Sequence, residues 1–592
     1  MRAALDWSYD LLSPPEQTVF RRLAIFVGGF TLAAAAGVAS DEGHPGDEVE
    51  RLVLELAAKS LVGADLDSPG PRFRLLYITR AYALEKAREA GELASLARRH
   101  ATCFLELLEA ASRHEHSEGD AGYSDAERDM DNLRAALPWA FGPAGDLTIG
   151  VGLAAASLPL WFSTSLLSEA RAWTERAIQA LDEARLRGTR QEMVLQTAFG
   201  ISLQMAGAGT SEAHAALSRA LALAEQFQDT DHHLHVVHTL WVYHMRIGEV
   251  SEALGLAHRA DALARSMADP DASAMARWML GIAQHFAGEH HSARRELEHL
   301  LIGPRPSSQR RQIRRAGFDP HTTARYILAH ILWVQGFPDQ AAEAVRISVE
   351  EARRIEHPVT LCSALAWGAC PLALLAGDLD AAWQSAAELV DHAEKHALAD
   401  HVCYGRATLE IISLRKAGPK VGAEQVRAAL QRWRASQWHV VLSVGDFAEA
   451  AAAAGLAGEI SALVDETLQR AECNQDLWAY PEMLRVKGEL LLRQDSPDPR
   501  QARECFERSL ERARAQGALA WQLRSAASLY RFDLRQGEGR ESREVLAQTC
   551  AQFREGFRTP DLRAARQLLV EGRAVRDPGR RDGPRNPIPY QD

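Results

Sequence analysis

The chain has 592 residues, of which 47% are hydrophobic and 25% charged, and its formal net charge is −12. This length exceeds what one hydrophobic core supports, so several domains or a repeat array are expected. The acidic balance argues against a chain that coats nucleic acid or an anionic membrane along its whole length. Seven scattered cysteines, none in a C-x-x-C pair, indicate reduced thiols in the cytoplasm rather than a disulfide framework or a zinc site.

No targeting or membrane segment is predicted. Asp6 and Asp10 lie where the apolar region of a signal peptide would begin. The stretch Leu147–Leu167 carries no charge and is about long enough to span a bilayer. Glycine, serine and threonine residues dilute it, however, and Pro159 would kink its middle. We therefore expect this stretch to form a buried helix of a solenoid.

The first 95 residues have the pattern of a winged helix. Ser13-Pro-Pro-Glu16 and Asp47-x-x-Glu50 are capping-box patterns, and each precedes apolar residues at helical spacing. Two short apolar stretches separated by Asp67-Ser-Pro-Gly-Pro71 predict a β-hairpin. The expected order is a helix from Pro14 that ends at Gly28-Gly29, a helix over 31–39, a helix over 47–60, strands over 61–65 and 73–77, and a helix over 78–90.

The helix in the DNA-reading position, 47–60, is acidic. It carries four Asp or Glu residues against Arg51 and Lys59, and residues 1–95 contain ten Lys or Arg against fourteen Asp or Glu. Phosphate contacts supply most non-specific affinity for DNA, so this balance favours a packing module over a DNA reader. Arg72 and Arg74 on the wing are the candidate phosphate contacts.

Three stretches of this region resemble the internal winged helix of bacterial STAND-type (NB-ARC-like) ATPase transcriptional regulators. They are LDWSYDLLSPPEQTVFRRLAIFVGGFTL (5–32), KSLV (59–62) and RFRLLYITRAYALEKAREAGE (72–92). The resemblance implies an ATPase module upstream, a winged helix that acts as a lid on the nucleotide switch, and helical repeats downstream. DMDNLRAAL (129–137), EARAWTERAI (169–178) and ILWVQGFPDQA (331–341) extend the resemblance over nearly the whole chain.

The chain departs from this family pattern in two places. It contains no G-x-x-x-x-G-K-[ST] motif, so nothing predicts a phosphate-binding loop. At the wing-to-helix junction, where related switches often carry a His-Asp pair, it has Leu75-Leu76-Tyr77. We therefore expect no cofactor and no ATP hydrolysis by this chain alone.

From about Leu96 onward the pattern is helical and repetitive. A glycine followed five residues later by an alanine recurs at steps of 40, 48, 41 and 41 residues. The glycine is expected to end the first helix of a hairpin, and the small alanine to let the second helix pack closely. This spacing predicts a TPR-like (tetratricopeptide-like) array. The pairs are Gly248/Ala253, Gly288/Ala293, Gly336/Ala341, Gly377/Ala382 and Gly418/Ala423.

Two basic segments and one histidine cluster stand apart from the repeats. The insert at 304–318 carries Arg310, Arg311, Arg314 and Arg315, which are candidate contacts to nucleic acid or an acidic partner, although a solvated loop is the more ordinary explanation. The tail at 571–592 has the composition of a disordered segment. In 231–238, His235 and His238 are spaced like metal ligands but lack a full ligand set, so a partly exposed helix start is expected. His290 and His291 are expected at the surface.

These patterns predict a mainly α protein: a small winged-helix domain followed by a TPR-like α-helical solenoid. The expected domains are a winged helix (1–95), a helical connector (96–168), repeats at 169–303 and 319–570 around the basic insert (304–318), and the tail (571–592). The favoured function is the sensor half of a STAND-type regulator, which binds a protein, peptide or small effector in the solenoid groove without catalysis. The alternative is a regulator that contacts DNA directly through the winged helix.

Overall fold

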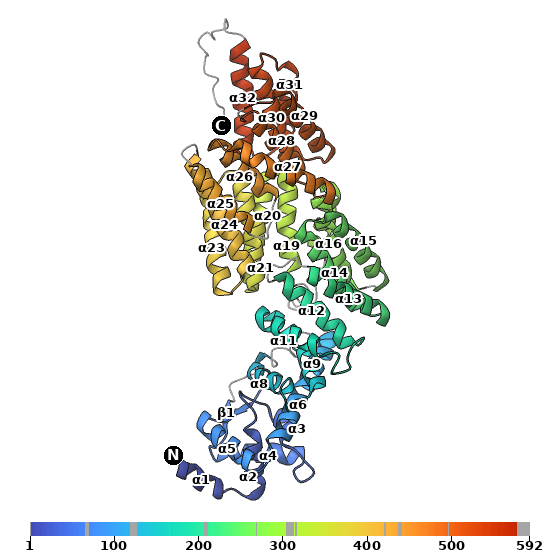
Figure 1. The fold of residues 1–592 in the computed structure, drawn as a ribbon, viewed down its shortest axis with the longest axis vertical. Coiled ribbons are helices and arrows are strands. Elements are labelled where there is room, and N and C mark those ends of the chain that lie inside the picture. Colours follow the sequence, from blue (N-terminus) through green and yellow to red (C-terminus); the bar gives the residue numbers. More distant parts are fainter. Residues whose placement is uncertain are drawn as a thin grey trace, which may run out of the picture. The chain divides into compact units, whose positions relative to one another are not determined.

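The computed structural model describes residues 2–65, 70–118, 127–164, 166–205, 211–267, 269–303, 309, 313, 317–418, 422–435, 441–494 and 496–576. The chain is mainly α-helical (Figure 1), and two short strands form the only sheet among these residues. It divides into two compact units. Unit 1 holds the described residues up to Val236 together with 309, 313 and 317, and unit 2 holds 237–303 and 318–576.

Unit 1 opens with the winged helix. Its strands pair antiparallel, with Ala64 opposite Phe73, and Phe73 also bridges to Phe30, which fastens the wing to the chain between the second and third helices. The elements are α1 (Arg2–Asp10), α2 (Pro14–Leu23), α3 (Leu32–Ala39), α4 (Gly46–Ala58), β1 (Gly63–Asp65), β2 (Arg72–Arg74) and α5 (Tyr77–Glu89). The hairpin turn at 66–69 lies outside the described residues.

The local signals of the winged helix differ in detail from expectation. Glu16 Oε2 accepts hydrogen bonds from both the backbone N–H and the hydroxyl of Ser13, each at 2.9 Å. The prediction that Asp47 caps the next helix is wrong. That helix starts at Gly46 after Pro45, so Asp47 lies in its first turn, where a negative charge still favours the positive end of the helix dipole.

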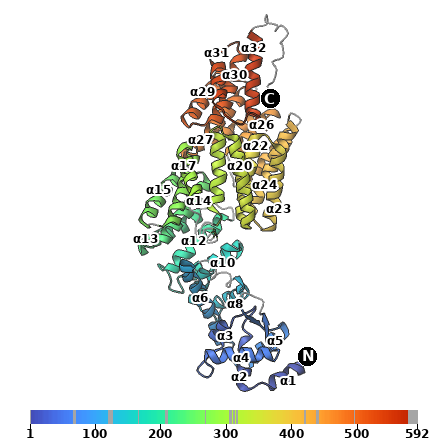
Figure 2. The same cartoon turned by 180° about the vertical axis from the view of Figure 1, so that it is seen from behind.

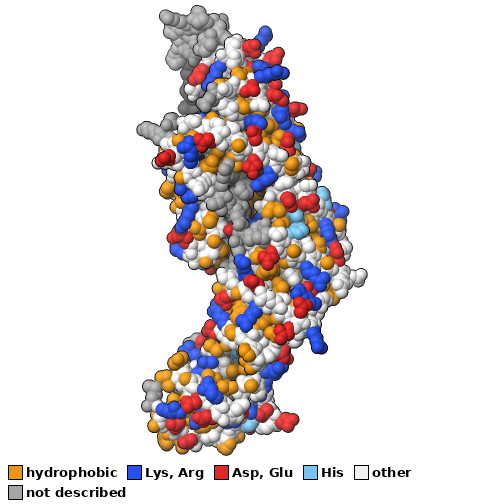
Figure 3. Space-filling view, in the orientation of Figure 1, with side chains coloured by type: hydrophobic (Ala, Val, Ile, Leu, Met, Phe, Trp, Pro, Cys, Tyr) orange, Lys and Arg blue, Asp and Glu red, His pale blue; other side chains and the backbone are white. Residues whose placement is uncertain are grey.

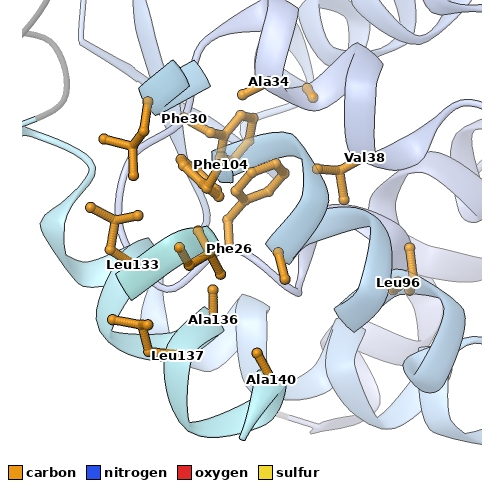
Figure 4. Close-up of a cluster of buried hydrophobic side chains, with 14 of the residues drawn as sticks. Phe26, Phe30, Ala34, Val38, Leu96, Phe104, Leu133, Ala136, Leu137 and Ala140 are labelled. Atoms are coloured by element: carbon orange, nitrogen blue, oxygen red, sulfur yellow. The ribbon is translucent and has the colours of Figure 1, made fainter. Parts of the chain in front are cut away.

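One hydrophobic core runs from the winged helix into the connector, and Figure 4 shows Phe26, Phe30 and Phe104 packed against Leu133, Ala136 and Leu137. The connector and first hairpins are α6 (Leu93–Glu118), α8 (Met130–Ala140), α9 (Leu147–Ala156), α10 (Leu158–Ser163), α11 (Leu167–Ala180), α12 (Arg190–Met205) and α13 (Ser211–Phe227). The apolar stretch 147–167 is not one continuous helix, because α9 ends before Ser157 and α10 begins after it, just ahead of Pro159.

A buried asparagine explains the DMDNLRAAL stretch. Asn132 is 0% exposed, and its Oδ1 accepts from Val27 N at 3.0 Å while its Nδ2 donates to Gly29 O at 3.0 Å. These bonds satisfy backbone groups of the irregular segment around Gly28-Gly29, which lies between two helices. Asn132 thus joins α8 to the winged helix.

Unit 2 is a stack of helical hairpins, in which a first helix and a second helix alternate. A lower row comprises α14 (Thr230–Ile247, whose first residues belong to unit 1), α15 (Val250–Met267), α16 (Pro270–Phe286), α17 (His290–Ile302), α19 (Pro320–Val334), α20 (Pro338–Ile355), α21 (Pro358–Ser363), η1 (Ala364–Ala369), α22 (Cys370–Ala376) and α23 (Leu379–Lys395). The pair α24 (Ala399–Ala417) and α25 (Ala423–Ala435) continues the stack. The upper row comprises α26 (Val441–Ala453), α27 (Ala457–Asn474), α28 (Tyr480–Leu491), α29 (Pro499–Ala515), α30 (Leu519–Arg535), α31 (Arg540–Gln552) and α32 (Pro560–Arg576).

The two rows meet at a contact that we call the seam: the lower-row turns at Gly288, Gly336 and Gly377 against residues 477–478, 516–519 and 553–560 of the upper row. In Figures 1 and 2 the upper row, coloured orange to red, lies beyond the ends of the green and yellow helices. A Cβ added at each of these glycines would lie 2.6–2.7 Å from an upper-row atom, of Gln516, Leu519 and Pro560 respectively. At Gly377 an added Cβ would meet the rigid ring of Pro560, whereas at Gly288 it would meet the flexible end of Gln516, which can move aside.

One described helical stretch, Pro358–Ala376, is apolar and long enough to cross a membrane by length and composition. It forms the first helix of a lower-row hairpin, and 56% of its apolar window is buried inside the protein. Its middle turns are π-helical at 364–369. Pro371 accounts for the widened turns, because it lacks an N–H and its ring would clash with the carbonyl of Trp367 in a regular α-helix.

Candidate functional site

A row of charged side chains follows the upper row and the adjoining α24. The helices α24, α26, α28, α30 and α32 contact one another in succession, so side chains on the same face of each form one continuous surface. Ten polar residues lie along this surface, eight in one network of ion pairs and hydrogen bonds and two, Arg415 and Asp446, in a neighbouring ion pair. We call all ten the charge ladder. They are Arg415, Asp446, Glu449, Glu482, Arg485, Glu489, Arg524, Ser528, Arg531 and Asp561.

The centre of the charge ladder is buried and fully paired. Glu482 and Arg485 are 4% and 8% exposed. The guanidinium of Arg485 donates to Glu482 at 2.7 and 2.9 Å and to Glu449 at 3.0 Å. Arg524 donates to Glu482 Oε1 at 2.7 Å and to Asp561 Oδ2 at 2.8 Å, so one carboxylate is held between two guanidinium groups from neighbouring helices.

The charges set the protonation of this centre. Burial alone would raise the pKa of Glu482, but the adjacent Arg485 and Arg524 outweigh it and lower that pKa to about 2. Asp446 is different: burial raises its pKa to about 6, although Arg415 lies 3.5 Å away. The centre of the ladder is therefore ionised at neutral pH, while one end carries a carboxyl group that titrates near pH 6.

The edges of the charge ladder are open to solvent. The side chains of Glu449 and Arg531 are 49% and 42% exposed. On the face of the upper row that Figure 3 shows, acidic and basic side chains are interspersed without a large patch of one sign. Such a surface can orient a partner that carries both charges, with the buried pairs as a rigid floor and the exposed members as contacts.

Sequence reasoning missed the charge ladder, although a signal was present. Glu482, Arg485 and Glu489 are spaced i, i+3, i+7, and Arg524, Ser528 and Arg531 are spaced i, i+4, i+7. Both spacings put charged or polar side chains on one helix face. A glycine-alanine repeat carries no information about polar residues, and the pairing across helices depends on a stacking that the sequence does not specify.

The arginines expected on the wing differ in environment. Arg72 is 8% exposed; its guanidinium forms an ion pair with Asp129 and donates to Gly29 O at 2.9 Å. Its side chain thus connects the wing to the connector. Arg74 is exposed at the end of β2. Arg310, Arg311, Arg314 and Arg315 lie outside the described residues, as does the tail from 577.

All five repeat glycines adopt positive φ, with Gly248 at 79°, Gly288 at 85°, Gly336 at 90°, Gly377 at 71° and Gly418 at 55°. Four of the paired alanines, Ala253, Ala293, Ala341 and Ala382, are 0% exposed, whereas Ala423 is half-buried. At each pair the glycine lies in the turn between two helices and the alanine lies in the second helix.

Two histidines that were expected to be exposed, His238 and His290, lie in the core. The expected exposure of the 231–238 cluster is wrong for His238, which is 2% exposed and packs against Trp241 and Trp278. The surface prediction is also wrong for His290, which is 0% exposed and lies 3.1 Å from His285, Nδ1 to Nδ1. Among the described residues, no group of three or more His, Cys, Asp or Glu side chains could hold a metal ion.

Comparison with known proteins relates part of the chain to transcriptional regulators. No protein-family model matches it. Over 238 residues it is 35% identical to proteins of Mycobacterium tuberculosis and Mycobacterium bovis named as putative HTH-type transcriptional regulators, a match that covers 39% of this chain and 26% of each relative. It is also 43% identical over 91 residues to an uncharacterised M. tuberculosis protein, covering 15% of this chain and 23% of that one. The chain thus spans about a quarter of the length of the curated relatives it matches.

Two solved structures are similar at low scores. A Rap protein in complex with the competence and sporulation factor covers 59% of this chain and 100% of its own, at 11% identity and a TM-score of 0.34. A STAND protein with a tetratricopeptide repeat sensor from Pyrococcus horikoshii covers 96% of this chain and 66% of its own, at 10% identity and a TM-score of 0.30. Scores at this level fix no correspondence of sites. The chain is related over part of its length to HTH-type transcriptional regulators, and it combines a winged helix with a TPR-like solenoid.

Proposed function

We propose that this chain is the sensor and interaction half of a STAND-type ATPase transcriptional regulator, and that it binds a protein or peptide partner on the charge ladder. The single observation that carries the proposal is the ladder itself, in which charges from five helices that contact one another in succession meet on one face. Helical solenoids present such continuous faces as extended binding surfaces. The partial identity to HTH-type regulators supports the regulatory role.

In this proposal the chain has no catalytic step of its own and acts in the cytoplasm. All seven cysteines are free thiols, which suits a reducing compartment. ATP turnover, where it occurs, belongs to an upstream module. Purified protein is expected to hydrolyse ATP no faster than buffer, and turnover above that background would remove the basis for a separate ATPase.

The winged helix serves in this proposal as a connection between the nucleotide switch and the solenoid. Arg72 supports this role over DNA contact, because its guanidinium is already bound by Asp129 inside unit 1. Its Nη1 is buried as well, so this group offers little to a phosphate in solution.

The test is capture of partners from an extract of the source cells by full-length protein. One variant reverses the charge of two exposed ladder residues (Glu449→Lys with Arg531→Glu). The control, Glu343→Lys, reverses the charge of an exposed residue of α20 outside the ladder. Proteins recovered by the wild type and the control but lost from the ladder variant are the expected result. Equal recovery by all three proteins would show that the ladder is not the binding surface.

A further inference from the structure

The seam between the two rows of unit 2 is built from reciprocal polar contacts between turns. Glu555 of the upper row accepts hydrogen bonds from the backbone N–H groups of Asp339 and Gln340, at 2.9 and 3.1 Å. These two N–H groups lie at the start of α20, so they have no acceptor within their own helix. In return Asp339 Oδ2 accepts from Gly556 N at 3.1 Å. Each row thus satisfies backbone groups of the other, so the contact has one defined register.

A tryptophan of the upper row anchors the other end of the seam. The N–H groups of Leu477 and Trp478 both donate to Phe286 O, at 2.8 and 3.1 Å. The Trp478 ring stacks on His330 with centroids 5.8 Å apart and planes 10° apart. Its own backbone carbonyl accepts from Trp521 Nε1 at 3.0 Å, so Trp478 is held within the upper row while its ring enters the lower one.

The closed seam also buries polar atoms that have no partner. His285 Nε2, His290 Nε2 and Gln516 Oε1 are buried without a hydrogen bond, although each of these residues uses its other polar atom. A buried unpaired polar atom is destabilising, and water would satisfy it if the rows separated. The closed contact therefore carries a penalty that separation of the rows would relieve.

From this combination of defined register and uncompensated polar burial, we propose that the seam is a releasable contact. The upper row separates from the turns of the lower row as a unit, while the helices within each row stay folded. Two features make release selective. The hydrogen bonds across the seam come from turns and single side chains, beside a small hydrophobic core that Val334 of the lower row shares with Trp478 and Trp521. Nine of the ten charge-ladder residues lie in the upper row, and the tenth, Arg415, lies in α24.

This inference goes beyond the proposed function and does not depend on it, because release is a property of the chain without any partner. It predicts that amides whose hydrogen bonds cross the seam become accessible together, at a lower free energy than amides inside α28 and α30. The reporters are the N–H groups of Asp339, Gln340, Leu477, Trp478 and Gly556.

The test is native-state hydrogen exchange on the full-length chain. Two variants weaken the seam, Trp478→Ala and Glu555→Ala, and Trp383→Ala is the control because this exposed tryptophan of α23 lies outside it. In either seam variant the reporter amides should exchange at least about tenfold faster, with amides inside α28 and α30 unchanged. If Trp478→Ala fails to fold, Glu555→Ala alone decides. The proposal is overturned if the wild-type reporters exchange only together with the interiors of α28 and α30, or if the variants accelerate both sets equally.

Discussion

Replacing Gly336 by alanine should destabilise unit 2 more than the same change at another glycine of similar backbone conformation. Gly336 has φ of 90°, and a Cβ there would lie 2.7 Å from Leu519 Cδ2 and 3.2 Å from Phe553 Cε1. Gly537, in the turn between α30 and α31, has φ of 78° and nothing within 4 Å of an added Cβ. The two positions share the backbone cost and differ in the packing cost.

The magnitudes follow from these two terms. An L-residue in the left-handed region costs about 1–2 kcal/mol, and an added methyl that forces its neighbours apart costs about 1–3 kcal/mol more. Gly537→Ala should therefore lower the free energy of unfolding by about 1–2 kcal/mol and Gly336→Ala by about 2–5 kcal/mol. Urea titration of each full-length variant, followed by tryptophan fluorescence, measures the difference.

Equal losses at Gly336 and Gly537 would refute the reasoning. They would mean that the repeat glycines are needed only for the turn conformation, and that the upper row does not pack closely against Gly336. Gly455, in the turn between α26 and α27, supplies a second control, because its φ is 78° and an added Cβ would again meet nothing within 4 Å. Gly455→Ala should match Gly537→Ala.

Three further changes test other parts of the structure. Burial lowers the pKa of both His238 and His401 to about 4, so below about pH 6.5 the unfolded chain binds protons that the folded chain does not. The free energy of unfolding should therefore fall by about 1–2 kcal/mol per histidine from pH 7.5 to 5.5. An unchanged Tm over this range would contradict the prediction. Arg72→Ala removes one partner of the largely buried Arg72–Asp129 ion pair and should cost about 3–5 kcal/mol in thermal melts. An unchanged melt with lost DNA binding would instead favour a DNA contact. Glu482→Gln removes a negative charge that the buried Arg485 and the partly buried Arg524 share, and it should cost about 3–5 kcal/mol by urea titration. A loss below about 1 kcal/mol would speak against a rigid ladder centre.

The fold was largely predictable because its signals are local. Apolar residues at helical spacing put Val49, Leu52, Val53 and Leu56 on one face of α4, and all four are buried. The glycine-alanine spacing marks the turns between hairpin helices, since a positive φ favours glycine wherever the turn lies. Local patterns of this kind need no knowledge of the tertiary structure.

The candidate site was not predictable because it depends on which helices stack. Glu482 pairs with Arg485 three residues further along α28, but it gains Arg524, 42 residues away in the sequence, only when α28 and α30 lie side by side. The same limitation explains the error at His290. A doubled histidine at a helix start has the pattern of a surface turn, yet this turn lies beneath the upper row, near Trp478. Neither contact is encoded in the spacing of neighbouring residues.

The most direct test of the central claim, that the charge ladder binds the partner, is site-specific photo-crosslinking. A photoreactive amino acid replaces Glu449 on the ladder in one full-length protein and Glu343 on α20 in another, both exposed positions. After irradiation in source-cell extract, a discrete crosslinked product from position 449 and none from position 343 is the predicted result. A product from position 343 alone, or equally from both, would contradict the assignment of the ladder as the binding surface.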